Sequence, residues 1–151
     1  GRLNMKENIM KTSARNQFAG IVKSIQTSGI HAQVVLTLPS NHELVATITS
    51  ESCAQLGLKE GDTAIALIKS VNIIIATNLE HVKLSARNQL KGVIEHVERG
   101  AVNSIVTLDL GSNVHIHAGV TVQSTEQLDL HPGQYATAVF KAGSVILGVL
   151  A

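Results

Sequence analysis

The same five residues, Ser-Ala-Arg-Asn-Gln, occur at 13–17 and again at 85–89 of this 151-residue chain. When the sequence is shifted by 72 residues, the match continues without a gap, so that "ATITSESCAQLGLKEG" at 46–61 aligns with "AGVTVQSTEQLDLHPG" at 118–133. Internal similarity at a fixed period indicates that one structural unit has been duplicated. We therefore expect a leader or cloning remnant at 1–10, a first module at 11–78, a linker at 79–82 and a second module at 83–151.

Composition removes several classes of function. The chain is 44% hydrophobic and 15% charged, with a net charge of +1, so it can bury a core and has no strong charge to attract nucleic acid or a membrane surface. Only 2% of the residues are aromatic, whereas proteins that bind single-stranded nucleic acid stack bases on aromatic side chains. The sequence shows no secretion signal and no 18-residue apolar run, and its lone Cys53 fits a reducing compartment. We expect a soluble cytoplasmic protein with no membrane or nucleic-acid partner.

Each module has the sequence pattern of β-strands. Ala32, Val34, Leu36 and Leu38 alternate with other residues, which is the period-two pattern of a strand with one buried face. Further strands are expected at "FAGIVKSIQ", "HELVATIT", "TAIALIK" and "VNIIIAT", with turns at 39–41 and 70–72. One stretch, "TSESCAQLGL", has helical spacing and a terminating glycine. Five strands and one short helix per module predict an all-β protein made of two tandem OB-like five-stranded Greek-key barrels.

Polar residues that are identical in both modules are candidates for a shared function. Thr49 suits the N-cap of the predicted helix, and Ser52 takes the position where a capping box would have Glu or Gln. Thr121 and Ser124 repeat this arrangement in the second module. Hydroxyl groups and free backbone N–H groups at a helix start suit an anion, although an ordinary cap explains these residues when they are considered alone.

Each module adds one arginine and one lysine to this set. Arg15 and Lys69 in the first module correspond to Arg87 and Lys141 in the second. The pentapeptide contributes a hydroxyl and an amide, so nearly all of the recurring groups are hydrogen-bond donors. A single Arg or Lys is more often a solvated surface charge, but their joint recurrence predicts a site for a small dianion with four acceptor oxygens.

The histidines and the cysteine do not form a comparable pattern. None of the seven histidines has a histidine at the shifted position, and Cys53 aligns with Thr125. Because catalytic and metal sites need convergent ligands, we expect no enzymatic activity and no metal bound directly by side chains. We interpret the histidines as surface residues, with His115 and His117 on one face of a strand. A nickel or zinc site at that pair is a minor alternative.

The stretches "TSARNQFAGIV", "TSESCAQLGL", "LIKSVNIIIAT" and "FKAGSVILGV" resemble the molybdenum-binding Mop (TOBE) module in its tandem form, the molbindins, over about 11–151. The resemblance implies OB-like barrels assembled into a homo-oligomer, with a trimer expected and a dimer left open. It also implies molybdate or tungstate as the bound oxyanion, held at interfaces between modules. The residues it assigns are Ser13, Arg15, Asn16, Thr49, Ser52, Lys69 and Ser70 in the first module, and Ser85, Arg87, Asn88, Thr121, Ser124, Lys141 and Ala142 in the second.

One of these positions differs between the modules, since Ser70 corresponds to Ala142. The second site loses a donor if the side-chain hydroxyl is used, and loses nothing if only the backbone N–H is used. The function that the resemblance implies is binding and storage of molybdate or tungstate in the cytoplasm. The alternative is the effector-sensing half of a molybdate-responsive transcription regulator, in which case the longer chain would bind DNA. The sequence itself contains no helix-turn-helix segment and no GxxxxGK[ST] phosphate loop.

Overall fold

Two five-stranded sheets dominate the computed structural model, which describes residues 12–150. The first sheet contains β1 (Asn16–Ser28), β2 (His31–Thr37), β3 (Glu43–Thr49), β4 (Thr63–Ile68) and β10 (Ile146–Gly148). The second contains β5 (Ile74–Ala76), β6 (Asn88–Arg99), β7 (Asn103–Gly111), β8 (Val114–Thr121) and β9 (Tyr135–Phe140). Two α-helices, α2 (Ser50–Leu56) and α3 (Val122–Gln127), and two 3-10 helices, η1 (Ser70–Asn72) and η2 (Ala142–Ser144), complete the described fold. The predicted all-β class is confirmed.

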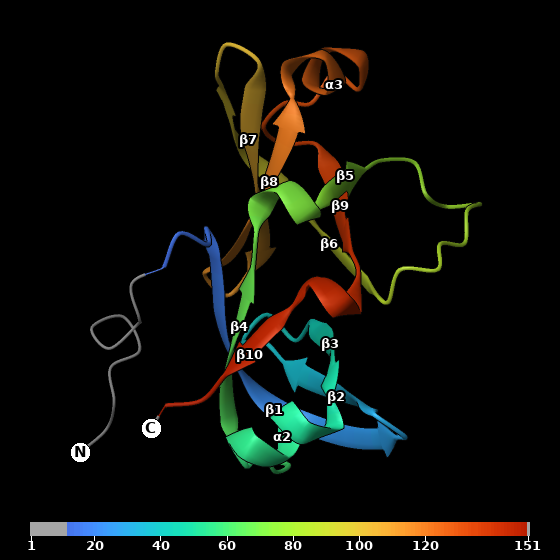
Figure 1. Ribbon diagram of the computed structural model, residues 1–151. Coiled ribbons are helices and arrows are strands. Elements are labelled where there is room, and N and C mark those ends of the chain that lie inside the picture. Colours follow the sequence, from blue (N-terminus) through green and yellow to red (C-terminus); the bar gives the residue numbers. More distant parts are fainter. Residues whose placement is uncertain (1–11, 151) are drawn as a thin grey trace.

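The two repeats exchange their last strands. The strand orders are β10-β4-β1-β2-β3 and β5-β9-β6-β7-β8, so each sheet takes its fifth strand from the other repeat (Figure 1). Leu147 is the partner of Ala66, and Ile75 is the partner of Ala138. The prediction of five strands per barrel is confirmed, but neither repeat completes its own sheet. The 3-10 helix η1 packs on β8 of the other half, and the strand after it, β5, pairs with β9 instead of returning to β4.

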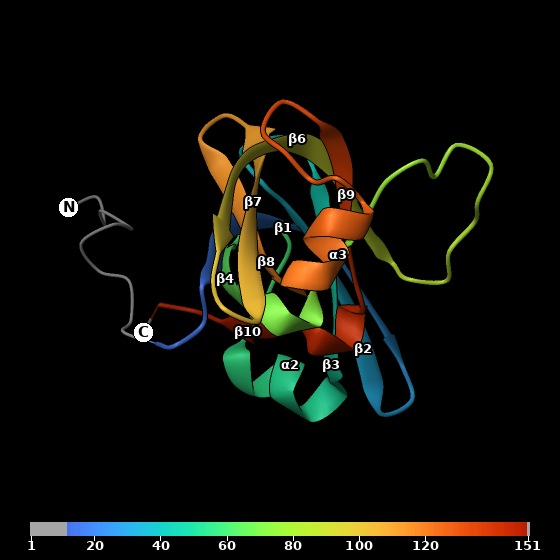
Figure 2. The same ribbon diagram turned by 90° about the horizontal axis from the view of Figure 1, so that it is seen from above.

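The core lies inside each curled sheet. Ala32, Val34, Leu36 and Leu38 are at most 1% exposed, which confirms the predicted buried face of β2. In each sheet the two edge strands contact each other, β3 with β10 and β5 with β8, so the sheets curve towards closed barrels. The connection between β5 and β6 projects away from this body (Figure 2). None of the described helices is long and apolar enough to span a bilayer.

Local signals in the sequence correspond to the observed elements. The first α-helix has Thr49 as its N-cap and ends at Gly57, whose φ of 64° is in the left-handed region that glycine adopts without strain. The predicted turn at 39–41 is present, with Asn41 at φ 68° and its N–H donating to the carbonyl of Leu38. The predicted turn at 70–72 is instead the 3-10 helix η1.

Candidate functional site

The asparagines of the repeated pentapeptide join the two halves of the molecule. Asn16 Nδ2 donates to the carbonyl of His117 at 2.8 Å, and its Oδ1 accepts from the N–H of His117 at 2.7 Å. Asn88 makes the same pair of bonds to Val45, both at 2.8 Å. His117 and Val45 are equivalent under the 72-residue shift, so the contact follows the internal symmetry. Both asparagines are buried, and their amides fix the start of β1 on β8 and the start of β6 on β3.

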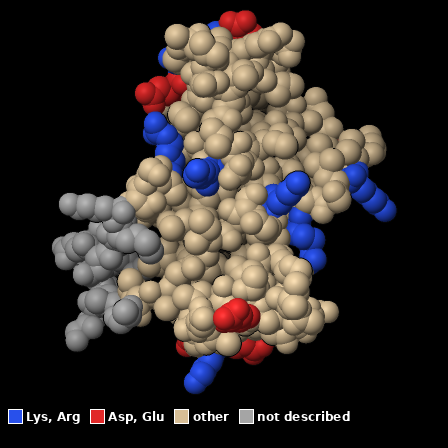
Figure 3. All heavy atoms as spheres, in the orientation of Figure 1, with Lys and Arg blue, Asp and Glu red and all other residues tan. Residues whose placement is uncertain are grey.

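This anchoring places the basic residues where the two halves meet. Asn16 pairs with Ile68 at the end of the β1–β4 ladder, so Arg15 and Lys69 leave the ladder side by side. The equivalent residues of the second repeat are Arg87, Asn88, Phe140 and Lys141. All four basic side chains are exposed. On the face shown in Figure 3, Lys and Arg side chains gather around the middle of the molecule, and Asp and Glu lie mainly towards its two ends.

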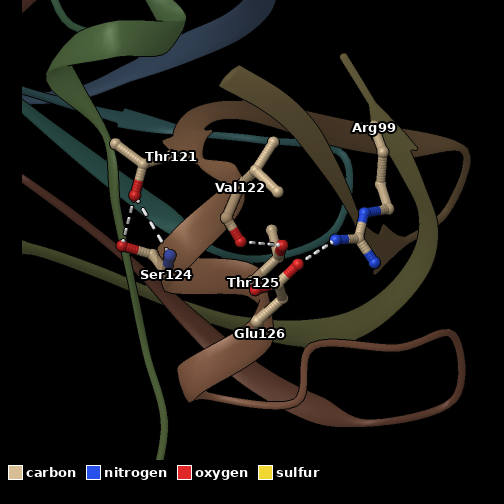
Figure 4. A network of polar contacts seen from close by, with 6 residues as sticks. All are labelled: Arg99, Thr121, Val122, Ser124, Thr125 and Glu126. Atoms are coloured by element: carbon tan, nitrogen blue, oxygen red, sulfur yellow. Dashed lines mark hydrogen bonds and ion pairs between the residues drawn. The ribbon is translucent and has the colours of Figure 1, made fainter. Parts of the chain in front are cut away.

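The threonine and serine at each helix start form the predicted cap. Thr121 Oγ1 accepts from the backbone N–H of Ser124 at 3.1 Å and donates its proton to Ser124 Oγ at 2.8 Å (Figure 4). Thr49 and Ser52 do the same at 3.0 and 2.7 Å. Because each threonine hydroxyl has one proton and has used it, the serine hydroxyl is left with a proton for an outside acceptor.

Predicted residues from different repeats line one cavity of about 390 Å³. Ser70 of η1 and Thr121 of β8 both line it, together with Ile105 and Gly119. A larger cavity of about 970 Å³ lies between the β5–β6 connection and the outer face of the second sheet, and none of the predicted site residues lines it.

In the other half, Arg87 contacts the other repeat through Gln33, a residue that was not predicted from the sequence. Arg87 Nη1 donates to Gln33 Oε1 on β2 at 2.8 Å. Gln33 was missed because the comparison of modules retained only polar residues that recur, and position 105 holds isoleucine. Its place on the outer face of β2, alternating with buried residues, was the available signal.

The predicted residues are not all in mutual contact. Ser13 and Ser85 are exposed just before β1 and β6, and Ala142 is buried without a hydroxyl. Within residues 12–150, no hydrogen bond joins one of the four predicted basic residues to a predicted serine or threonine. The two sets of residues therefore do not saturate each other, although Arg87 already donates to Gln33 and each cap threonine to its serine.

His115 and His117 lie on one face of β8, as predicted, although His117 is only partly exposed there. Its ring is partly buried, and Nδ1 lies 2.9 Å from Thr107 Oγ1. Burial lowers the pKa of His117 below 6.5; His115 and Arg15 lower it further, and Glu95 opposes them. The physical reason is the asparagine clamp, which holds β8 against β1. Within the described residues, no group of three or more histidine, cysteine, aspartate or glutamate side chains is placed to bind a metal ion.

Comparison with known proteins identifies the family. The TOBE domain model matches residues 12–75 and 84–147, which together make up most of the sequence. The chain therefore belongs to the TOBE-domain family, as two tandem copies, and the resemblance noted from the sequence is confirmed.

Several relatives are similar over most of this chain. The molybdenum transport protein ModE of Herbaspirillum seropedicae is 46% identical over 140 residues, and the molybdenum-pterin-binding protein MopB of Rhodobacter capsulatus is 40% identical over 141. Both alignments cover 93% of this chain and 52% of the relative, so the chain spans about half the length of these proteins. A solved structure of the cytoplasmic molybdate-binding protein ModG with molybdate bound has a TM-score of 0.90 and 40% identity, and the match covers 93% of this chain and 100% of ModG.

A shorter relative matches one repeat only. A probable molybdenum-pterin-binding protein of Haemophilus influenzae is 43% identical over 67 residues, which is 44% of this chain and 97% of the relative. A protein about the size of a single repeat therefore exists.

Proposed function

We propose that this chain binds molybdate or tungstate and serves as a non-enzymatic binding and storage protein of the cytoplasm. The observation that carries the proposal is that groups predicted from one repeat meet strands of the other, as Ser70 and Thr121 do at one cavity and as Arg87 does on β2. The high similarity to ModG, which was solved with molybdate bound, supports molybdate as the ligand.

The proposed sites are composite: the basic residues and the pentapeptide serine come from one repeat, and the threonine and serine of the helix cap come from the other. Positive charge and several donors together suit a desolvated dianion, since charge-assisted hydrogen bonds are stronger than neutral ones. We assign Asn16 and Asn88 to positioning, because their amides already bind backbone groups. The first site comprises Ser13, Arg15, Lys69, Ser70, Thr121 and Ser124. The second comprises Ser85, Arg87, Lys141, the backbone of Ala142, Thr49 and Ser52.

The two lysines provide the test of this function. Lys69→Ala and Lys141→Ala remove charge-assisted donors, where truncation costs about 2–5 kcal/mol of binding free energy. Lys59→Ala, at an exposed lysine of a turn outside both sites, is the control. Calorimetry with molybdate should show weaker binding in the first two variants and an unchanged affinity in the control. Equal affinity in all of them would exclude the lysines from the sites.

We further propose that the chain forms a homo-oligomer, with a trimer expected from the family resemblance. Ile74 and Ile146 occupy equivalent positions on edge strands β5 and β10 and are 64% and 65% exposed. Exposed apolar side chains on unpaired strand edges favour association with another chain. Analytical ultracentrifugation at micromolar concentration should detect the oligomer, and a monomer with and without molybdate would contradict it.

A second candidate function is the effector-sensing half of a molybdate-responsive transcription regulator. The observation in its favour is that the chain is 38% identical over 142 residues to the DNA-binding transcriptional dual regulator ModE of Escherichia coli. Sequencing the gene beyond both ends of this chain distinguishes the two candidates, since a regulator would encode a DNA-binding segment there.

A further inference from the structure

The two composite sites differ at one cross-strand pair of residues. On the first sheet, Gln33 of β2 lies opposite Thr47 of β3. On the second sheet, the equivalent pair is Ile105 of β7 and Gly119 of β8. A polar pair in one half has therefore been replaced, at both of its positions, by residues without polar side chains in the other.

The first member of the polar pair holds a basic residue. The carboxamide oxygen of Gln33 accepts a hydrogen bond from Arg87 Nη1 at 2.8 Å. The arginine of the other site, Arg15, has Ile105 at the corresponding place, and an isoleucine side chain cannot accept a hydrogen bond. Fixing a long side chain before a ligand arrives reduces the conformational entropy that binding must remove.

The second member of each pair, Thr47 or Gly119, faces a 3-10 helix, and the hydroxyl at this contact is carried either by the strand or by the helix. A Cβ placed on Gly119 would lie 3.4 Å from Ser70 Oγ and 3.4 Å from Val71 Cγ1, so this position directly faces the 3-10 helix η1. In the other half, β3 packs against η2 as β8 packs against η1. Thr47 takes the place of Gly119 there, facing Ala142, which takes the place of Ser70. Each half therefore has one hydroxyl at this contact, carried by the helix in one case and by the strand in the other.

We propose that Gln33 and Thr47 are specificity-determining residues that make the site of Arg87 and Lys141 the tighter of the two oxyanion sites. Gln33 acts as a positioning residue for the Arg87 guanidinium. Thr47 supplies the hydroxyl that Ala142 lacks. The second site therefore does not lose a donor where Ala142 stands in place of Ser70. The first site keeps Ser70 but has Ile105 in place of Gln33, so it lacks the acceptor that positions Arg87. This inference rests on the proposed oxyanion-binding function.

Calorimetric titration of the full chain with molybdate tests the proposal. The wild-type chain should show two affinity classes, and Lys141→Ala identifies the class that belongs to the Arg87 site. Gln33→Ile introduces the isoleucine found in the other half. Thr47→Val introduces an isosteric side chain without a hydroxyl. Each should weaken the tighter class by about 2- to 10-fold and leave the weaker class unchanged.

Three further variants separate a role at the site from a general effect on the sheet. Thr47→Ser retains the hydroxyl and should retain the affinity. Thr37→Val removes a threonine hydroxyl from the other end of the same β2–β3 hairpin, opposite Glu43, and should change neither class. Ile105→Gln provides an acceptor for Arg15 and should tighten the weaker class.

Two results would overturn the inference. One is a single affinity class in the wild-type chain. The other is that Gln33→Ile and Thr47→Val leave both affinities unchanged or weaken both of them equally. Both results leave the proposed function intact, because molybdate still binds. A wild-type chain that binds no molybdate at any concentration would instead reject the proposed function, and this inference with it.

Discussion

Two asparagine side chains connect the halves of this molecule more directly than any of the basic residues beside them. Asn16 and Asn88 are 1% and 0% exposed, and each bonds both the N–H and the carbonyl of one residue on a strand of the other repeat. The residues they bind, His117 and Val45, have unrelated side chains, because the contact uses only the backbone. Each asparagine therefore joins the two repeats, and it also sets where the neighbouring basic residues lie.

Replacement of Asn16 by alanine should lower the free energy of unfolding by about 1–3 kcal/mol, since it leaves buried backbone groups of His117 without partners. Gln89→Ala is the control, because this exposed amide bonds only the nearby carbonyls of Leu84 and Ala86. Urea denaturation at a fixed protein concentration measures both. Equal stability of the two variants would show that the clamp contributes nothing.

His117 should make the stability of the protein depend on pH. Its pKa in the folded chain lies below 6.5, mainly because its ring is partly buried. Below pH 6.5 the unfolded chain binds more protons than the folded one at this residue, so stability falls as the pH drops from there through the folded-state pKa. At higher pH both states are neutral and the effect vanishes.

His117→Val, which introduces the residue found at the equivalent position 45, should remove this dependence. The stability of the wild type relative to the variant should decline between about pH 7.5 and about pH 5.5, by no more than about 1.4 kcal/mol per pH unit. Thermal unfolding of both proteins across this range provides the measurement. A constant difference between them would contradict the partly buried, neutral state of this imidazole.

At the scale of elements, local signals were readable from the sequence and long-range pairing was not. Thr49, Gly57 and the turn at 39–41 each depend on chemistry within a few residues, and each was predicted correctly. The short strands β5 and β10 were also expected. Their sequences fit either sheet equally well, because period-two alternation specifies a buried face and says nothing of which neighbour supplies it.

The candidate site shows the same division. The recurring Arg, Lys, Thr and Ser were found by comparing the two modules, and the helix caps were confirmed. Gln33 and Thr47 were not found, because their contribution depends on a cross-strand pair that differs between the modules. The partial burial of His117 was also missed, since it follows from a contact between residues 101 positions apart.

Strand exchange predicts that a single repeat cannot complete its own sheet. Residues 12–78 alone lack β10, which pairs with β4, and should fold only by taking a strand from another copy. Circular dichroism and ultracentrifugation should therefore show folding that depends on concentration, and residues 79–150 added in trans should restore the β structure. A folded monomer of 12–78 would contradict the exchange.

At the scale of the whole molecule, the proposed sites should select among tetrahedral anions. They offer hydroxyl, guanidinium, ammonium and backbone N–H donors, and few acceptors. Molybdate and tungstate are nearly equal in size and should bind about equally. Sulfate has shorter bonds and leaves donors unpaired, at about 1–3 kcal/mol each, which gives about 10²–10⁴-fold weaker binding.

Phosphate should bind most weakly, because near neutral pH it retains a proton that needs an acceptor. Competition calorimetry at fixed ionic strength tests the whole order. Phosphate that displaces molybdate at a comparable concentration would indicate an unselective anion site, and the storage function would lose its main support.

In the proposed sites, residues of two different repeats together hold each oxyanion. Tungsten scatters X-rays anomalously, so crystals grown with tungstate would locate the anion independently of any assumption about its ligands. We expect tungsten between the Lys69–Ser70 stretch and Thr121, and between Lys141 and Thr49. Tungsten held by residues of one repeat alone, or bound only outside both of these places, would contradict it.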